Sequence, residues 1–124
     1  MGLDLPDSEI YNAMIAFYGI ERVTKRINKF EPLPDFGRRF DLITAYSVCF
    51  DMHHTSEVWG PAEWTFFLND CRTQLNPRGK IFLNFNPATN SEFNFIPDSV
   101  ATMLRKLPGG TLTANKEFFT LQCN

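Results

Sequence analysis

The feature that most constrains the fold of this chain is a pair of apolar segments with an amphipathic segment between them. Residues 42–48 are almost continuously apolar or small, and residues 80–86 (KIFLNFN) form a second such run. Between them, Pro61 suits the first turn of a helix, and apolar side chains then recur at helical spacing: Trp64, Phe67, Leu68, Cys71 and Leu75. The order strand, helix, strand predicts that the segments beginning at Phe40 and Lys80 are parallel neighbours in one sheet, covered on both faces.

The remaining segments continue this alternation. Apolar spacings of three and four residues predict a helix over residues 10–17, ended by Gly19, and another over residues 100–107. A short strand over residues 22–27, nearer an edge than the centre of the sheet, and one or two terminal strands over residues 111–121 complete the set. We therefore expect the 124 residues to form one α/β domain, with a mostly parallel sheet and flanking helices.

The net charge and the longest apolar run exclude two classes of partner. The net charge is −2 and the isoelectric point about 5.6, whereas sequence-independent binding to a phosphate backbone needs a basic stripe. The longest apolar run, residues 13–20, is far shorter than the roughly 20 residues of a membrane-spanning helix. Acidic residues occupy the place where a signal peptide would be basic and then apolar: Asp4, Asp7 and Glu9. We expect no nucleic-acid partner and no membrane partner.

The three cysteines indicate the compartment. Cys49, Cys71 and Cys123 are widely spaced, form no CxxC pair and leave one thiol unpaired whatever the connectivity. Free, partly buried thiols are typical of a reducing environment, so we expect a cytoplasmic protein. Cys49 is interpreted as a small buried hydrophobe rather than as a nucleophile.

The order of the segments resembles that of the class I S-adenosylmethionine-dependent methyltransferases. Residues 40–45 (FDLITA) look like the fourth strand of that family, and residues 33–34 match the loop that often precedes it. Leu68 followed by residues 75–83 (LNPRGKIFL) is similar to the family's passage of helix, turn and fifth strand. Residues 2–5 (GLDL) look like the end of the second strand. The resemblance covers nearly the whole chain and implies a Rossmann-like sheet.

The resemblance also implies an incomplete domain. The family carries an acidic residue and a Gly-rich loop after its first strand, where backbone N–H groups approach the amino-acid part of the cofactor. None of the seven glycines of this chain forms such a loop. If Asp4 ends the second strand, the first strand and its loop would lie before Met1. The chain is then a single, partial methyltransferase-like domain, incomplete at its amino-terminal end.

In open α/β sheets, ligands bind beyond the carboxyl ends of the strands. There the resemblance assigns six residues to S-adenosylmethionine: Asp4 to the ribose hydroxyls, Leu5 as an apolar neighbour of adenine, Asn28, Lys29 and Phe30 beside the adenine, and Tyr46 near the methyl donor. A carboxylate suits the ribose because it accepts hydrogen bonds from both hydroxyls. The alternative for Asp4 is a loop aspartate, or a charge that favours the dipole of the following helix.

Residues 51–60 are expected to be a loop, and this loop holds the candidates for catalysis. His53 and His54, with Asp51 and Glu57 close by, are the candidate catalytic residues, because a histidine near neutral pKa acts as a general base on a hydroxyl or amine. The alternative is that the two histidines are only a polar pair in a loop. No general base is then required, because methyl transfer often depends chiefly on proximity and alignment. We assign no metal site, because the rings of adjacent histidines seldom point at one ion.

The sequence supports two functions of different classes. The first is transfer of the methyl group of S-adenosylmethionine to an oxygen or nitrogen nucleophile of a small molecule, with Trp59 lining the substrate pocket or packing in the core. The second is a non-catalytic remnant of such an enzyme, whose exposed sheet edge is covered by a partner or by a second copy of itself. A third interpretation is an unrelated α/β domain that shares the same periodicity.

Overall fold

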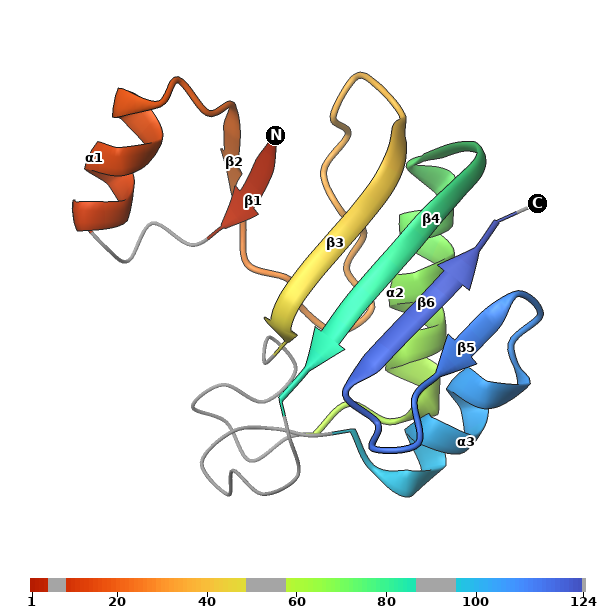
Figure 1. Ribbon diagram of the computed structural model, residues 1–124. Helices are drawn as coiled ribbons and strands as arrows, with labels where there is room; N and C mark the ends of the chain where they lie inside the picture. Colours follow the sequence, from red (N-terminus) through yellow and green to blue (C-terminus); the bar gives the residue numbers. More distant parts are fainter. Residues whose placement is uncertain (5–8, 49–57, 87–95, 124) are drawn as a thin grey trace.

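Helices and strands alternate along the chain, as the sequence predicts. The computed structural model describes residues 1–4, 9–48, 58–86 and 96–123. Its elements are β1 (Gly2–Asp4), α1 (Glu9–Phe17), β2 (Arg22–Thr24), β3 (Phe40–Val48), α2 (Pro61–Thr73), β4 (Leu75–Phe85), α3 (Asp98–Lys106), β5 (Gly110–Leu112) and β6 (Phe118–Gln122). The strands form two sheets (Figure 1), a parallel pair β1-β2 and a four-stranded sheet of order β3-β4-β6-β5. The fold is therefore α/β.

Strands β3 and β4 lie side by side and run in the same direction, which confirms the central prediction from the sequence. Leu42 is opposite Lys80, and the register continues to Ala45 opposite Leu83. The turn predicted at residues 76–79 interrupts this register but lies within β4. Phe40 already pairs with Leu75, so pairing begins before the turn, and residues 76–79 bulge out opposite a single residue of β3. Helix α2 consequently ends at Thr73, two residues earlier than the apolar spacing predicted.

The four-stranded sheet is mixed, whereas the sequence predicted one mostly parallel sheet. Strand β6 is antiparallel to both β4 and β5. The reason lies in the connection, because β5 and β6 are joined by a short turn rather than by a helix. Thr113 N–H donates to the carbonyl of Phe118 (3.0 Å), and Lys116 adopts a left-handed φ of 61° in this turn. A tight turn joins antiparallel strands, whereas parallel neighbours need a crossover connection.

The core lies between the four-stranded sheet and helices α2 and α3, which cover one of its faces (Figure 1). Alternate residues of β4 point into it and are buried: Ile81, Leu83 and Phe85. Trp59 is 3% exposed, and its ring centroid lies 5.4 Å from that of Trp64 and 5.9 Å from that of Phe67. Trp59 is therefore a core residue, and the interpretation of this side chain as part of a substrate pocket is wrong.

The second face of the four-stranded sheet is open, which corrects the prediction that β3 is covered on both faces. Leu42 and Tyr46 of β3 are 53% and 69% exposed. Tyr46 contacts Phe82 of β4 with ring centroids 5.6 Å apart, and Phe82 contacts Phe118 of β6 at 6.0 Å. Within the described ranges no helix packs over this aromatic row. The apolar run in β3 is thus explained by core packing on one face only.

The amino-terminal unit consists of β1, α1 and β2 and lies beside β3 (Figure 1). The predicted helix and the predicted short edge strand are both present. Gly19 ends α1 with a left-handed φ of 62°, and Ile20 N–H donates to the carbonyl of Ile15 (3.0 Å), as in a Schellman motif. Yet α1 contains no buried residue, and Phe17 is 82% exposed. Within the described residues, no helix combines the length and the apolar composition needed to cross a membrane.

Candidate cofactor site

The carboxyl ends of the parallel strands define the candidate site. Figure 1 shows β1, β3 and β4 pointing toward the same edge of the molecule, and β2 is parallel to β1. Asp4 is the last residue of β1 and is paired with Thr24, the last residue of β2. The chain after β2 then supplies residues 28–30, and β3 supplies Tyr46 near its end. The strand arrangement therefore brings the ends of four strands to one edge, where ligands of open α/β sheets bind.

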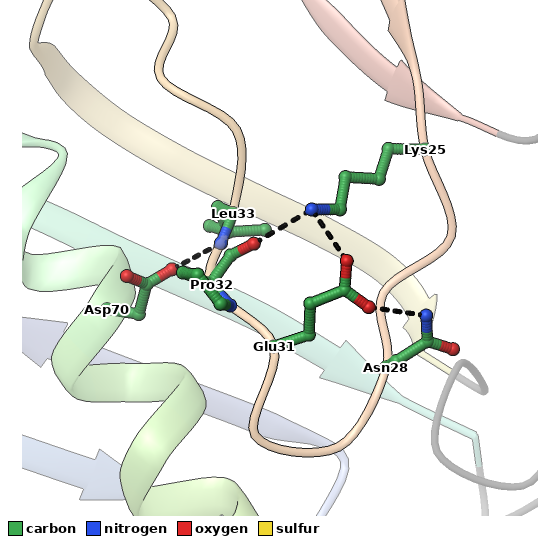
Figure 2. Close-up of polar contacts among 6 residues, drawn as sticks. All are labelled: Lys25, Asn28, Glu31, Pro32, Leu33 and Asp70. Atoms are coloured by element: carbon green, nitrogen blue, oxygen red, sulfur yellow. Dashed lines mark hydrogen bonds and ion pairs between the residues drawn. The ribbon is translucent and has the colours of Figure 1, made fainter.

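The chain after β2 is held by a cluster of three polar side chains (Figure 2). Lys25 Nζ lies 2.9 Å from Glu31 Oε1 and donates to the carbonyl of Pro32 at 3.0 Å. Asn28 Nδ2 donates to the other carboxylate oxygen, Glu31 Oε2, at 2.7 Å. One carboxylate thus receives a charged donor and an amide donor on its two oxygens. These contacts close residues 25–32 into a turn.

These contacts lower the pKa of Glu31 below its ordinary value. The hydrogen bond from Asn28 is the largest cause, and the hydrogen bond and the positive charge of Lys25 follow. All three favour the ionised carboxylate, so Glu31 accepts from both neighbours at neutral pH. The ammonium of Lys25 is neutralised within the turn by the same carboxylate.

The orientation of the Asn28 amide follows from this carboxylate. An ionised carboxylate only accepts hydrogen bonds, so the donor Nδ2 must face Glu31. The carbonyl oxygen Oδ1 of Asn28 therefore points away from Glu31, as Figure 2 shows. Asn28 presents a hydrogen-bond acceptor at the edge of the turn.

Two contacts attach the turn to helix α2. Leu33 N–H donates to Asp70 Oδ2 at 2.7 Å, and the ring of Phe30 meets that of Phe66 edge-on with centroids 5.8 Å apart. Phe30 adopts a left-handed φ of 55°, which is uncommon for a residue with a bulky side chain and is typical of constrained, functional positions. Its ring remains 53% exposed. The turn therefore carries an accessible aromatic ring in a fixed place.

The end of β3 is constrained by β4. Ser47 has a left-handed φ of 51°, and its N–H donates to Asn84 Oδ1 at 3.2 Å. Asn84 Nδ2 in turn donates to the carbonyl of Glu117 at 3.4 Å, which links β3, β4 and the segment before β6. Tyr46 precedes this constrained residue and lies on the open face of the sheet, against Phe82.

The predicted cofactor residues fall into two groups. Asn28, Lys29 and Phe30 lie together in the turn beside α2, which covers one face of the sheet. Tyr46 lies on the other face of β3, because side chains alternate along a strand and its neighbour Ala45 packs against the core. Asp4 occupies the predicted place at the end of a strand.

Three other predicted residues lie outside the residues that the structure describes. They are Leu5 of the cofactor site and the candidate catalytic histidines, His53 and His54. Cys49 is also outside the described ranges.

The sequence reasoning missed three residues that build the turn. Lys25 and Glu31 flank the predicted residues 28–30, and their opposite charges six positions apart were a signal for an ion pair across a turn. Asp70 had no such signal, because it lies 37 positions from Leu33 along the chain.

Within the described residues, neither a cluster of metal ligands nor the pocket at the start of β4 coincides with this edge. In the described part of the chain no three His, Cys, Asp or Glu side chains gather as metal ligands would. A pocket of about 600 Å³ lies where β4 begins and is lined by Arg39 and Arg72. Arg39 there donates to the carbonyls of Thr73 and Leu75, and so satisfies main-chain acceptors at the end of α2.

No family model, curated protein or solved structure matches this chain. The assignment of a function therefore depends on the strand arrangement and on the turn that Glu31 closes.

Proposed function

We propose that this chain is the S-adenosylmethionine-binding part of a Rossmann-like methyltransferase, which transfers a methyl group to an oxygen or nitrogen nucleophile of a small molecule. The observation that supports the proposal is the arrangement of two parallel pairs, β2-β1 and β3-β4, which point toward the same edge of the molecule, with residues 28–30 in the chain that follows β2. The fourth and fifth strands inferred from the sequence correspond to β3 and β4, and the second corresponds to β1.

The turn supplies what an adenine ring requires. Adenine offers an exocyclic amino group as a hydrogen-bond donor, and Asn28 Oδ1 is an acceptor that Glu31 holds in one orientation. The exposed ring of Phe30 offers an apolar surface against which a planar base packs. An oriented acceptor beside an aromatic ring is a combination suited to a base.

S-adenosylmethionine carries a sulfonium cation, and an unpaired ammonium nearby would repel it. Lys25 is paired with Glu31 at 2.9 Å, which neutralises one of the three basic side chains of residues 25–32. We assign Asp4 to the ribose hydroxyls, with Leu5 beside the base and Tyr46 on the side of the methyl donor.

The remaining parts of the proposal concern catalysis and location. His53 and His54 are assigned to proton removal from the methyl acceptor, as inferred from the sequence. The cytoplasmic location is supported by Cys71 and Cys123, which are both free thiols.

Calorimetric titration with S-adenosylhomocysteine tests the proposal directly. We expect saturable heat at high protein concentration, and the absence of any heat would remove the enzyme interpretation of this chain. We expect Asn28→Ala to weaken binding about tenfold, which is about 1.4 kcal/mol. Asn69→Ala, an exposed asparagine on α2 whose side-chain oxygen accepts a hydrogen bond from Arg72, is the matched control and should leave the affinity unchanged.

A second function, a binding module without catalysis, is favoured by a separate observation. Among the residues that the structure describes, the facing edges of β1 and β3 have no further strand partner, and an apolar pocket lies between them. An unpaired strand edge is a place where another chain adds. Because this function needs no cofactor, the absence of heat with S-adenosylhomocysteine would not contradict it.

A further inference from the structure

A pocket lies at the opposite edge of the four-stranded sheet from the candidate cofactor site. Strand β4 begins there and β6 ends there, while β3 and β4 point toward the other edge (Figure 1). We name it the arginine pocket. Its volume is about 600 Å³, in the range of small-molecule sites. Its lining comes from distant parts of the chain: Arg39 before β3, Arg72 on α2, residues 75–77 at the start of β4, Pro108 after α3 and residues 122–123.

The charge of this pocket is positive. Arg39 and Arg72 line it, and none of the described residues in its lining is an aspartate, a glutamate or a histidine. Among the residues that the structure describes, neither guanidinium is paired with a carboxylate, and the hydrogen bonds of both go to neutral acceptors. The neighbouring Arg38, in contrast, is paired with Glu21. Two unneutralised positive charges in one cleft attract an anion and repel a cation.

Arg39 is held in place by the end of helix α2. Its Nη1 donates to the carbonyls of Thr73 and Leu75. The carbonyl between them, that of Gln74, accepts from Phe40 N–H at 2.9 Å. These bonds satisfy the carbonyls that carry the partial negative charge of the helix end. A guanidinium has five N–H groups, and the two on this Nη1 are used here. The three on Nη2 and Nε of Arg39 are left for a ligand.

Arg72 keeps still more of its donors. Its Nη1 donates to Asn69 Oδ1 at 3.2 Å, and this is the one hydrogen bond that the described residues give to its guanidinium. A planar guanidinium binds two oxygens of a phosphate or carboxylate at once, which an ammonium does not. Both arginines therefore retain N–H groups of the kind that bind an oxyanion.

Two side-chain amides of the lining are held by their nitrogen atoms. Gln122 Nε2 donates to the carbonyls of Arg78 at 2.6 Å and Cys123 at 3.2 Å. Asn76 Nδ2 donates at 2.9 Å to Oδ1 of Asp41, which lies outside the lining. Because carbonyl and carboxylate oxygens accept hydrogen bonds, the amide nitrogens must face them, and the amide oxygens Oε1 and Oδ1 remain as acceptors. An acceptor repels an anion but binds a hydroxyl group, so the occupant carries donors as well as a negative charge.

We propose that the arginine pocket binds a small organic phosphate that also carries hydroxyl groups. A phosphate monoester has a charge of about −1.5 to −2 at neutral pH and three acceptor oxygens, which matches two guanidiniums. The hydroxyl groups donate to Gln122 Oε1 and Asn76 Oδ1, and the rings of Pro77 and Pro108 contact the carbon skeleton. The pocket is at the opposite sheet edge from the proposed cofactor site, so its ligand binds whether or not the cofactor is bound.

Calorimetric titration of the full chain with glycerol 3-phosphate tests this site. We expect saturable binding at low salt, and binding at least tenfold weaker in about 0.5 M sodium chloride, because salt screens the two guanidiniums. Inorganic phosphate, which lacks the hydroxyl-bearing skeleton, should bind at least threefold more weakly, and succinate, a dianion without phosphate, at least tenfold more weakly. Absence of binding, binding that salt does not weaken, or equal affinity for inorganic phosphate or succinate would overturn the proposal.

Two glutamine variants locate the binding to the pocket. We expect Arg72→Gln to weaken glycerol 3-phosphate binding at least tenfold, because the variant keeps an amide donor but loses the charge and the planar fork. Arg38→Gln removes the same charge from the residue next to Arg39, outside the lining, and should leave the affinity within about twofold of the parent. Equal losses in the two variants would mean general electrostatic attraction and would contradict the proposal.

A substitution at Arg39 separates binding from folding. Because Arg39 also donates to the carbonyls at the end of α2, its removal would affect stability as well. Arg39→Lys keeps the positive charge and a donor for these carbonyls but removes the planar fork. We expect this variant to bind glycerol 3-phosphate at least fivefold more weakly, while its circular dichroism spectrum stays that of the parent. An unchanged affinity would contradict a site built from two arginines.

Discussion

Helices α1 and α2 show how differently two parts of this molecule use the same sequence pattern. Both have apolar residues at helical spacing, and both follow a strand. Helix α2 buries four side chains against the four-stranded sheet, namely Trp64, Phe67, Leu68 and Cys71, whereas α1 buries none. The difference lies in what is opposite each helix. Spacing determines which side chains share a face, and a packing partner decides whether that face contributes to stability.

The two regions also differ in what they offer to a ligand. The amino-terminal unit has strands of three residues and no buried helical residue, while the four-stranded sheet with α2 and α3 contains the core. Regions with few buried apolar contacts open locally at low free energy and are where binding elements are found. We therefore expect mutations in the core to change the free energy of unfolding, and mutations in the amino-terminal unit to change binding.

The largest expected effect compares one buried and one exposed aromatic side chain. Trp64 is fully buried against Trp59, Phe67 and Phe85, so Trp64→Ala should lower the free energy of unfolding by about 3–5 kcal/mol. Phe17→Ala should change it by less than about 0.5 kcal/mol. Urea denaturation followed by circular dichroism measures both. Similar losses for the two variants would mean that α1 has a packing partner.

A glycine pair extends the comparison to the backbone. Gly109 and Gly19 both have left-handed φ, of 77° and 62°. A Cβ at Gly109 would meet the carbonyl oxygen of Gln122 at 2.5 Å, whereas one at Gly19 would meet nothing within 4 Å. We expect Gly109→Ala to destabilise the protein by about 2–3 kcal/mol and Gly19→Ala by about 1 kcal/mol. Equal urea midpoints for the two variants would show that the backbone near Gln122 moves to accommodate the added Cβ without a loss of stability.

The binding role that we propose for the amino-terminal unit is tested at Asp4. We expect Asp4→Ala to weaken S-adenosylhomocysteine binding by more than tenfold, about 1.4 kcal/mol, because the ribose hydroxyls lose their acceptor. The urea midpoint should not change, since Asp4 belongs to a strand of three residues in the unit without a core. Glu9→Ala, which removes an exposed carboxylate of the same unit, is the control. An unchanged affinity in calorimetry would refute the ribose assignment.

The smallest expected effect is a pH dependence of the turn at residues 25–32. The pKa of Glu31 is lowered in the folded chain, so its contacts stabilise the turn above the ordinary value of 4.5 and are lost as the pH falls through the lowered value. Titration followed by carboxyl NMR should give a midpoint below 4.5. Asn28→Ala and Lys25→Met should each raise this pKa, because each variant removes a contact that favours the ionised carboxylate. An unchanged midpoint in both variants would show that these contacts do not hold the pKa down.

The helices and strands of this fold were predictable where the local sequence pattern and the tertiary packing favour the same element. The helix after Pro61 and the parallel pair that begins at Phe40 and Lys80 follow from periodicity and from the crossover rule. The candidate site was predictable only in part. Asn28 and Phe30 were named, but the orientation of the Asn28 amide depends on Glu31, and the place of the turn depends on a hydrogen bond to Asp70 from a distant element.

The sequence by itself determined the alternation of elements, the direction of β3 relative to β4, and the identity of the residues at the strand ends. The tertiary structure decided that Trp59 is buried, that Tyr46 lies on an open face, and that the edges of β1 and β3 face each other across a groove. The physical reason is the distance along the chain over which each kind of interaction acts. Helix and strand periodicity arise from neighbours within a few residues, whereas burial and edge pairing depend on which distant segment is placed opposite.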